Sequence, residues 1–130
     1  MRRIFLASPL AIAMTAQIVA AQEVTLPSGL TVTYLDRIVE RQATGETWLT
    51  LRFVTPRIDR RSGDLGYEDV ALDLDRLCDS EGLNAVAETG AVDQVMIALM
   101  DRALERGATD PDATMFIGAY LPTTEGCVWQ

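Results

Sequence analysis

The sequence predicts an α+β fold in which an antiparallel sheet of about four to five strands carries one main helix on one face. Three observations support this fold class. Residues 67–83 have a helical apolar repeat, alternating segments stand before and after them, and two cysteines could join the helix to the last strand by a single disulfide. Together they indicate one small domain, residues 22–130, behind a leader, residues 1–21.

The main helix is predicted over residues 67–83. Apolar residues recur there every three or four positions, which places them on one face of a 3.6-residue repeat. This stripe consists of Tyr67, Val70, Ala71, Leu74, Leu77 and Cys78. The outer side is expected to carry Asp69, Asp73, Arg76 and Ser80. Gly82 occupies the position of a C-terminal stop, and residues 85–92 are expected to be irregular.

Two strands are predicted before the helix. Residues 30–39 alternate between apolar and polar side chains until the pattern slips near Leu35 or Asp36, which indicates a bulge. Residues 47–55 alternate more regularly, with Leu49, Leu51 and Phe53 directed inward. We expect residues 22–29 to be a lead-in and residues 57–66 to be an exposed loop.

The assignment after the helix is less uniform. Residues 93–103 contain a continuous apolar run, which fits either a strand covered on both faces or a helix; we favour the strand. Asp110 and Pro111 are typical of a helix start, so a helical turn is expected over residues 111–115. Residues 116–121 are predicted to form a strand, and residues 127–129 a final edge strand.

The first 21 residues are predicted to be a secretory signal peptide. Arg2 and Arg3 precede an apolar stretch, and a small-residue motif ends at Ala21, so cleavage is expected before Gln22. A buried N-terminal helix is the alternative. We favour the general secretion route, with twin-arginine export as the second option. No cysteine stands near the cleavage site, so no membrane anchor is expected after cleavage, and the mature protein is placed in the bacterial periplasm or medium.

Cys78 and Cys127 are the only cysteines, and an even pair in an exported chain is predicted to form a disulfide. Two buried free thiols are the alternative. Closing a loop of this length removes roughly 4 kcal/mol of conformational freedom from the unfolded chain on the chain-entropy model. The bond is therefore expected to supply a large share of the stability of so small a domain.

Charge and composition exclude several functions. The 19 acidic residues all follow Gln22, whereas the 11 basic residues are all arginine and two of them belong to the leader. An acidic chain of this kind repels nucleic acid, so no nucleic-acid partner is expected. Histidine and lysine are absent, which excludes histidine-based nucleophile pairs and zinc sites, Schiff bases and a phosphate-loop lysine. No cofactor is predicted.

Five residues are candidate contacts for a protein partner, and we expect neither a catalytic nor a metal site. They are Trp48, Arg57, Arg60, Arg61 and Trp129. Tryptophan and arginine are favoured at interaction hot spots. The alternatives are that both tryptophans cover the edge of the core, and that the arginines are solvated or paired with aspartates.

The order of six segments resembles a family of small exported bacterial proteins that is catalogued only as a domain of unknown function. The segments are LPSGLTVTYLD, LRFVTPRI, GYEDVALDLDRLC, DQVMIAL, DPDATMFIGAY and GCVWQ. The resemblance covers most of residues 22–130 and implies a strand over residues 94–99. It implies no substrate, cofactor or catalytic residue.

The predicted function is that of a non-enzymatic interaction module for an unknown protein partner in the cell envelope. The acidic charge suggests one version, an inhibitor or accessory of a cationic envelope enzyme. The competing hypotheses are a small carboxylate-dependent hydrolase and a calcium-dependent binding domain that uses Asp110 and Asp112 with Asp64 or Glu68.

Overall fold

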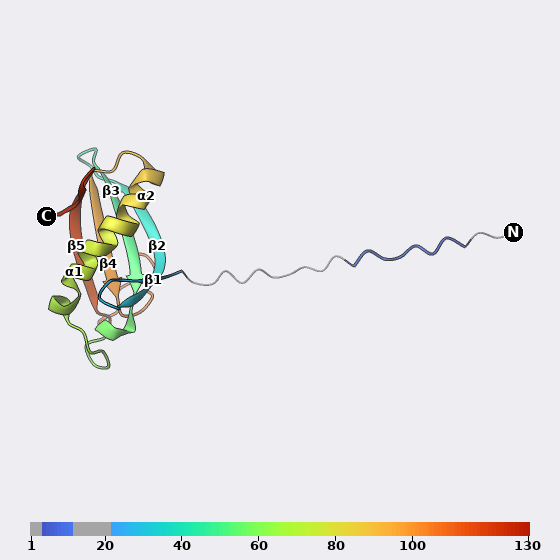
Figure 1. Cartoon of the computed structure of the whole chain (residues 1–130), viewed down its shortest axis with the longest axis horizontal. Helices are drawn as coiled ribbons and strands as arrows, with labels where there is room; N and C mark the ends of the chain where they lie inside the picture. The colour runs from blue at the N-terminus through green and yellow to red at the C-terminus, as the bar shows by residue number, and fades with distance from the viewer. Residues whose placement is uncertain (1–3, 12–21) are drawn as a thin grey trace.

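A computed structural model describes residues 4–11 and 22–130 of the chain (Figure 1). Residues 4–11 contain no helix or strand, and the apolar side chains of Ile4, Phe5 and Leu6 are exposed. The rest of the predicted leader, including Ala21 at the cleavage site, lies outside the described residues. The elements are β1 (Glu23–Thr25), β2 (Thr31–Arg41), β3 (Thr47–Val54), η1 (Pro56–Ile58), α1 (Tyr67–Leu77), η2 (Cys78–Gly82), α2 (Leu83–Thr89), β4 (Gln94–Met100), β5 (Met115–Thr123) and β6 (Gly126–Trp129).

The strands form one six-stranded sheet in sequence order, β1 to β6. Neighbouring strands are antiparallel except β3 and β4, which are parallel. The predicted antiparallel sheet of four to five strands is therefore wrong. The helical crossover explains the difference, because it returns the chain to the end of the sheet where β3 began, so β4 must run in the same direction as β3. The three residues of β1 are too few to show an alternating pattern.

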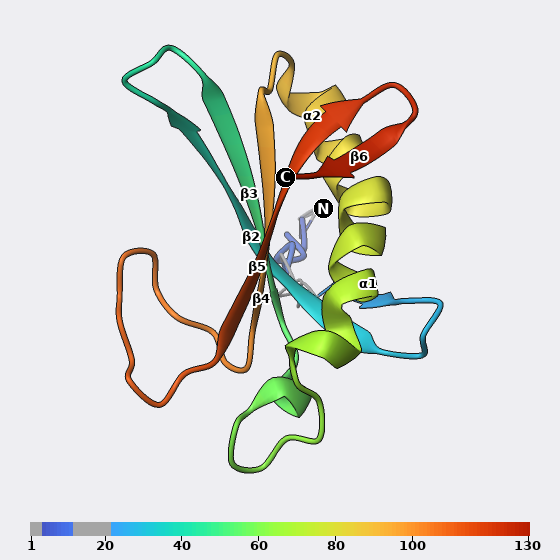
Figure 2. The same ribbon diagram turned by 90° about the vertical axis from the view of Figure 1, so that its left-hand side faces the viewer.

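Among the residues that the structure describes, a single helical layer covers one face of the sheet, and the other face carries no helix (Figure 2). In this layer α1 continues through a π-helical turn, η2, into α2. Gly82 is therefore not a helix stop: its φ of −63° is helical, and the layer ends at Gly90, whose φ is 103°. A Cβ atom on Gly82 would lie 3.2 Å from the Cys78 Sγ atom. The glycine thus allows close packing rather than ending the helix.

The hydrophobic core lies between this helical layer and the sheet. The predicted inward residues Leu49, Leu51 and Phe53 are buried there. The other fully buried side chains include Val70, Leu74 and Leu77 of α1 and Val95, Ile97 and Leu99 of β4.

Two polar groups tie α1 to its surroundings. The buried Tyr120 hydroxyl donates a 2.7 Å hydrogen bond to Asp75, and burial, aided by this carboxylate, raises the pKa of Tyr120. Asp73 is buried rather than on the outer side, and it accepts a 2.6 Å hydrogen bond from the Ser28 hydroxyl. The prediction that Asp73 lies on the outer side of the helix is wrong, because the turn before β2 covers that side.

The predicted disulfide between Cys78 and Cys127 is confirmed, and it joins the π-helical turn to β6. The backbone N–H of Cys127 points away from β5 and donates a 2.9 Å hydrogen bond to a carboxylate oxygen of Asp79. The partner of Cys127 in β5 is Pro122, which has no N–H group. Asp79 therefore caps the outer edge of the sheet beside the disulfide.

Other sequence predictions had mixed outcomes. The bulge in β2 is confirmed between Tyr34 and Asp36, and residues 94–100 are a strand, as favoured. The helical turn over residues 111–115 is wrong, because the Asp110 carboxylate accepts the Asp112 N–H and only a single turn forms before β5. The exposed loop over residues 57–66 also includes the buried Ile58.

Within residues 4–11 and 22–130, no helix is long and apolar enough to cross a bilayer.

Candidate functional site

The two tryptophans predicted as contacts lie on opposite faces of the sheet. Trp48 is half-buried on the face without helices, and its indole N–H donates a 3.0 Å hydrogen bond to Glu46. Trp129 is 67% exposed and shares the helix side with Tyr120, its partner in β5. The strands β3 and β6 are three positions apart in the sheet, or roughly 14 Å at the usual strand spacing. The two tryptophans therefore do not form one contact site.

Arg57 is also separate from the other two predicted arginines. Its guanidinium forms a two-point ion pair with Asp64 in the same loop, with N···O distances of 3.0 and 2.7 Å. The guanidinium holds the pKa of the Asp64 carboxyl below its usual value. Arg57 is thus neutralised within its own loop, as the alternative interpretation expected.

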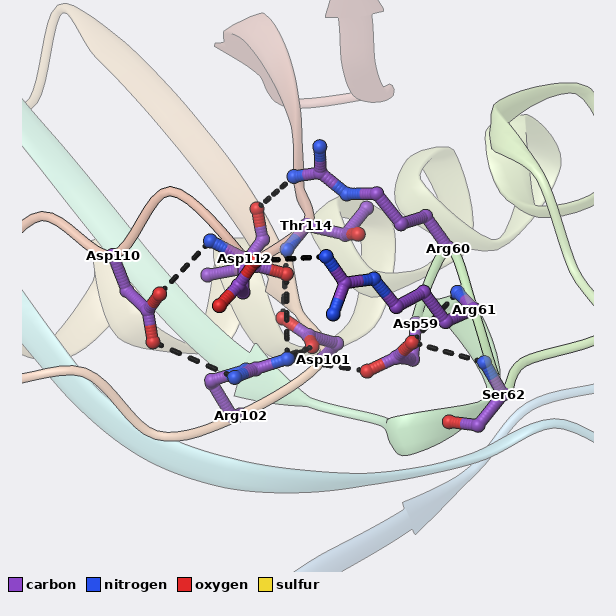
Figure 3. A network of polar contacts seen from close by, with 10 residues as sticks. Asp59, Arg60, Arg61, Ser62, Asp101, Arg102, Asp110, Asp112 and Thr114 are labelled. Atoms are coloured by element: carbon purple, nitrogen blue, oxygen red, sulfur yellow. Dashed lines mark hydrogen bonds and ion pairs between the residues drawn. The ribbon is translucent and has the colours of Figure 1, made fainter.

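Arg60 and Arg61 join a polar network between the loops that follow β3 and β4 (Figure 3). The Arg60 guanidinium donates a 2.7 Å hydrogen bond to the carbonyl of Ala113. Arg61 forms an ion pair with Asp112 at 3.2 Å. These contacts hold the two loops together at the carboxyl ends of the parallel strands.

Arg102 lies at the centre of this network, which we call the Arg102 cluster: Asp59, Asp101, Arg102 and Asp110. Its guanidinium contacts Asp59 at 3.1 Å and Asp110 at 3.4 Å. It donates from Nε to Asp101 at 2.9 Å. The Asp101 side chain is only 1% exposed, and it also accepts the Thr114 N–H at 2.8 Å. A buried carboxylate with these partners fixes the loop that contains it.

The carboxylates of the Arg102 cluster are engaged by their own chain. The backbone N–H groups of Ser62 and Arg61 lower the pKa of Asp59 to about 2. Asp110 accepts from Arg102, whereas Asp64 is paired with Arg57, so the acids considered for calcium are divided between different partners. In the described part of the chain, no three carboxylates or thiols gather as a metal site. The Arg102 cluster thus connects the loop after β3 to the loop after β4.

The face of the sheet opposite the helices carries an apolar surface that sequence reasoning missed. The register places Trp48, Met96 and Ile117 on this face, because their neighbours along each strand are buried beneath the helices. We call the following residues the open-face patch: Ile38, Trp48, Met96, Ile117, Leu121 and Val128. Ile117, Leu121 and Val128 are 52%, 44% and 49% exposed.

Two arginine–carboxylate ion pairs lie beside the open-face patch. Arg52 donates from Nε to Asp36 at 2.6 Å, and this hydrogen bond lowers the pKa of the Asp36 carboxyl. Arg106 forms an ion pair with Glu40 at 3.2 Å. Arg52 also donates to the carbonyl of Leu104 at 2.9 Å. The loop of residues 101–114 therefore crosses this face near the carboxyl ends of β3 and β4 and leaves the patch uncovered.

The helical layer presents a very different surface. Residues 67–89 contain Arg76 as their only basic residue, against seven acids, of which only Asp73 is buried. The other six are Glu68, Asp69, Asp75, Asp79, Glu81 and Glu88. Leu72 is an isolated apolar side chain on this surface and is 75% exposed. The molecule is thus acidic on its helix side and largely apolar on its open side.

The sequence did contain a signal for the open-face patch. Residues 94–100 and 115–121 carry apolar side chains at both odd and even positions. In a strand, this pattern indicates that both faces leave water. The first run predicts a strand covered on both faces, but the sequence does not identify what covers the second face.

Comparison with known proteins identifies a family and nothing narrower. No curated protein matches this chain. No solved structure matches it either. The profile of the family described as "Family of unknown function (DUF6497)" matches residues 10–130. With nearly the whole chain matched, the protein belongs to the DUF6497 family.

Proposed function

We propose that residues 22–130 are an exported, non-enzymatic interaction module that binds a folded protein partner in the cell envelope through the open-face patch. One observation carries this proposal: a sheet face without helices displays apolar side chains from β2 to β6. Water disfavours such a surface, and contiguous apolar patches of this kind mark interaction sites on soluble proteins.

The shape and charge of the patch define the partner. Five strands span roughly 19 Å at the usual strand spacing, which suits a flat protein surface better than a small molecule. The charges of Asp36 and Arg52, and those of Glu40 and Arg106, are paired with each other beside the patch, whose own side chains are all uncharged. The partner is therefore a protein whose contact surface is flat, apolar and uncharged at its centre.

Composition and the state of the acids favour binding over catalysis. The chain lacks histidine and lysine, so a hydrolase would depend on carboxylates. The most clustered carboxylates, those of the Arg102 cluster, accept hydrogen bonds from Arg102 and from backbone N–H groups. A general acid or base needs a proton-transfer partner in a cleft, and these groups are already engaged with the chain itself.

Two features support the proposal of export. The disulfide is of the kind that persists in oxidising compartments. The N-terminal arginines and apolar stretch have the order of a secretory leader. We therefore place the mature module in the periplasm or medium of a bacterium, after removal of residues 1–21.

A pair of matched variants tests the proposal. Ile117→Arg places a charge in the open-face patch, and Leu72→Arg places the same charge on the helical layer. Each purified oxidised domain is immobilised and exposed to periplasmic extract of the native host, with and without chelator. We expect a partner that binds wild type and Leu72→Arg equally, is lost from Ile117→Arg, and ignores the chelator.

Three results would contradict the proposal. Equal binding by both variants would show that the open-face patch is not the contact. Loss of the partner with chelator alone would favour the calcium-dependent alternative. Turnover of glycoside or peptide substrates by the wild-type domain would favour the hydrolase. Circular dichroism and thermal melting of both variants control for unfolding.

A further inference from the structure

A small polar hollow lies between residues 81–88 of the helical layer and β2. Its lining includes the buried side chains of Leu51 and Ala85. The hollow measures about 240 Å³, which is less than the roughly 300–1,000 Å³ of typical ligand pockets. A group that belongs to the chain is therefore a better occupant than a separate ligand. We call this feature the Glu81 hollow, after a glutamate in its wall.

The wall of the Glu81 hollow carries one negative charge in excess. One basic side chain, Arg37, lines the hollow together with two acidic ones, Glu81 and Glu88. The Arg37 guanidinium is held by Glu88 at 2.6 Å. Glu81 is half-buried and forms no ion pair within the described residues. Arg76 lines the neighbouring hollow with Glu81 and Asp79, but its exposed guanidinium forms no ion pair with either. A partly buried carboxylate is stabilised by a cation, and Glu81 lacks one.

Gln22 is placed to supply that cation. It also lines the Glu81 hollow. Its backbone carbonyl accepts the Tyr34 N–H at 2.8 Å, so the sheet holds this residue beside the wall. Cleavage before Gln22 would convert its backbone nitrogen into an α-amino group, which is largely protonated at neutral pH. Removal of the leader at the predicted site therefore adds a positive charge to the wall that lacks one.

We propose that the Glu81 hollow is the binding site of the processed N terminus, in which the α-ammonium group of Gln22 pairs with Glu81. Removal of residues 1–21 thus creates an ion pair that ties the start of β1 to the π-helical turn η2, which contains Glu81. This inference rests on the export and cleavage in the proposed function, but it is independent of the open-face patch.

The pairing also protects the N-terminal glutamine from cyclisation. In that reaction the uncharged α-nitrogen attacks Cδ of its own side chain: the N–Cδ bond forms, the bond from Cδ to the amide nitrogen breaks, and ammonia leaves. A protonated nitrogen has no lone pair for this attack. Glu81 therefore slows the reaction, because a nearby carboxylate favours the charged form of the amine.

Amine acylation tests the ion pair directly. The chain has no lysine, so the α-amine of a domain that begins at Gln22 is its only primary amine. The oxidised domain is released from an N-terminal fusion by a protease that cuts directly before Gln22, so the assay does not depend on export. We expect an N-hydroxysuccinimide ester of acetate to acylate Glu81→Gln about two- to fivefold faster than wild type at neutral pH, since only the uncharged amine reacts. The matched control is Glu68→Gln, which removes an exposed acid at the start of α1 and should react at the wild-type rate.

Thermal melting of the acetylated domains provides a second readout. Acetylation removes the charge of the α-amine and should lower the melting temperature of wild type and of Glu68→Gln by about 1–4 °C. Glu81→Gln should melt at the same temperature before and after acetylation, because its partner for the ammonium group is already lost. On storage, intact mass should show that Glu81→Gln loses ammonia faster than wild type.

Two kinds of result would overturn the inference, and they are distinguishable. Equal acylation rates of wild type and Glu81→Gln, or an unchanged melting temperature of acetylated wild type, would show that the ion pair does not form, whatever the route of export. N-terminal sequencing of protein from the periplasm should begin at Gln22. A different first residue would overturn the cleavage on which this inference and the exported location both depend, even if the domain prepared from Gln22 forms the pair.

Discussion

The two faces of the sheet carry similar apolar side chains but differ in how far these side chains are buried. In β4, Val95 and Ile97 face the helices and are fully buried, whereas Met96 between them stays partly exposed on the open side. In β5, Tyr120 is buried and its neighbour Leu121 is 44% exposed. Residue hydrophobicity does not separate the faces; the crossover helix does, because it seals one side only. The apolar character of the other side therefore requires its own explanation, which we assign to a partner.

The largest expected effect concerns the disulfide, which joins the helical layer to β6 on the covered face. The double variant Cys78→Ser, Cys127→Ser should lose roughly 4 kcal/mol in the free energy of unfolding, because the link between residues 49 positions apart no longer restricts the unfolded chain. Urea unfolding followed by circular dichroism measures the change. A loss under about 1 kcal/mol would show that other contacts hold β6 to the helical layer.

Two isoleucines on neighbouring strands provide the sharpest comparison of the faces. Ile97 is fully buried under the helices, whereas Ile117 is 52% exposed on the open face. Ile97→Ala should lower the free energy of unfolding by about 3 kcal/mol, since it leaves a cavity. Ile117→Ala should change it by less than about 1 kcal/mol.

Urea unfolding of both variants decides between two explanations of the open face. A large loss for Ile117→Ala in the isolated domain would mean that this face is part of the core, and the partner would no longer be needed to explain it. A small loss combined with lost partner binding would strengthen the contrast.

The smallest expected effect concerns the Arg102 cluster, which connects the loop that crosses the open face to the loop that follows β3. The pKa of Asp59 is lowered from 3.8 to about 2 in the folded protein. A lowered pKa stabilises the fold above the ordinary value, and this stabilisation disappears as the pH falls from about 5 towards 2. Asp59→Asn should therefore be less stable at neutral pH and lose less stability on acidification.

Thermal melting as a function of pH measures this difference in slope. The slope that persists in Asp59→Asn reports Asp36 and Asp64, whose pKa values are lowered by hydrogen bonds from Arg52 and Arg57. An unchanged slope would show that the pKa of Asp59 does not differ between the folded and the unfolded protein.

Local patterns predicted much of the fold. The period of residues 67–83 identified α1, the slipped alternation identified the bulge in β2, and the cysteine pair identified the disulfide. Strand direction could not be predicted in the same way. Strand direction depends on where the crossover returns the chain. Gly82 misled the prediction because it resembles a helix stop, although it lies within the helical layer and packs closely against Cys78.

The candidate site was harder to predict because it depends on register and on long-range contacts. Single residues such as Trp48 and Arg61 were conspicuous in the sequence, yet they lie on different surfaces and have partners of their own. The open-face patch is built from ordinary apolar residues, whose exposure follows only from the order of strands and the path of the loops. Because helices cover one face only, the exposure of the other face depends on the tertiary arrangement and cannot be predicted from sequence patterns.

The carboxylate that caps Cys127 has a consequence for how this protein behaves in a crowded compartment. An incoming strand from another molecule would find the outermost hydrogen-bond donor of β6 already occupied and a negative charge beside it. Addition of a further strand at the β6 edge is thereby made less favourable. The edge strand beside the exposed hydrophobic side chains of the open face is thus partly engaged by its own chain.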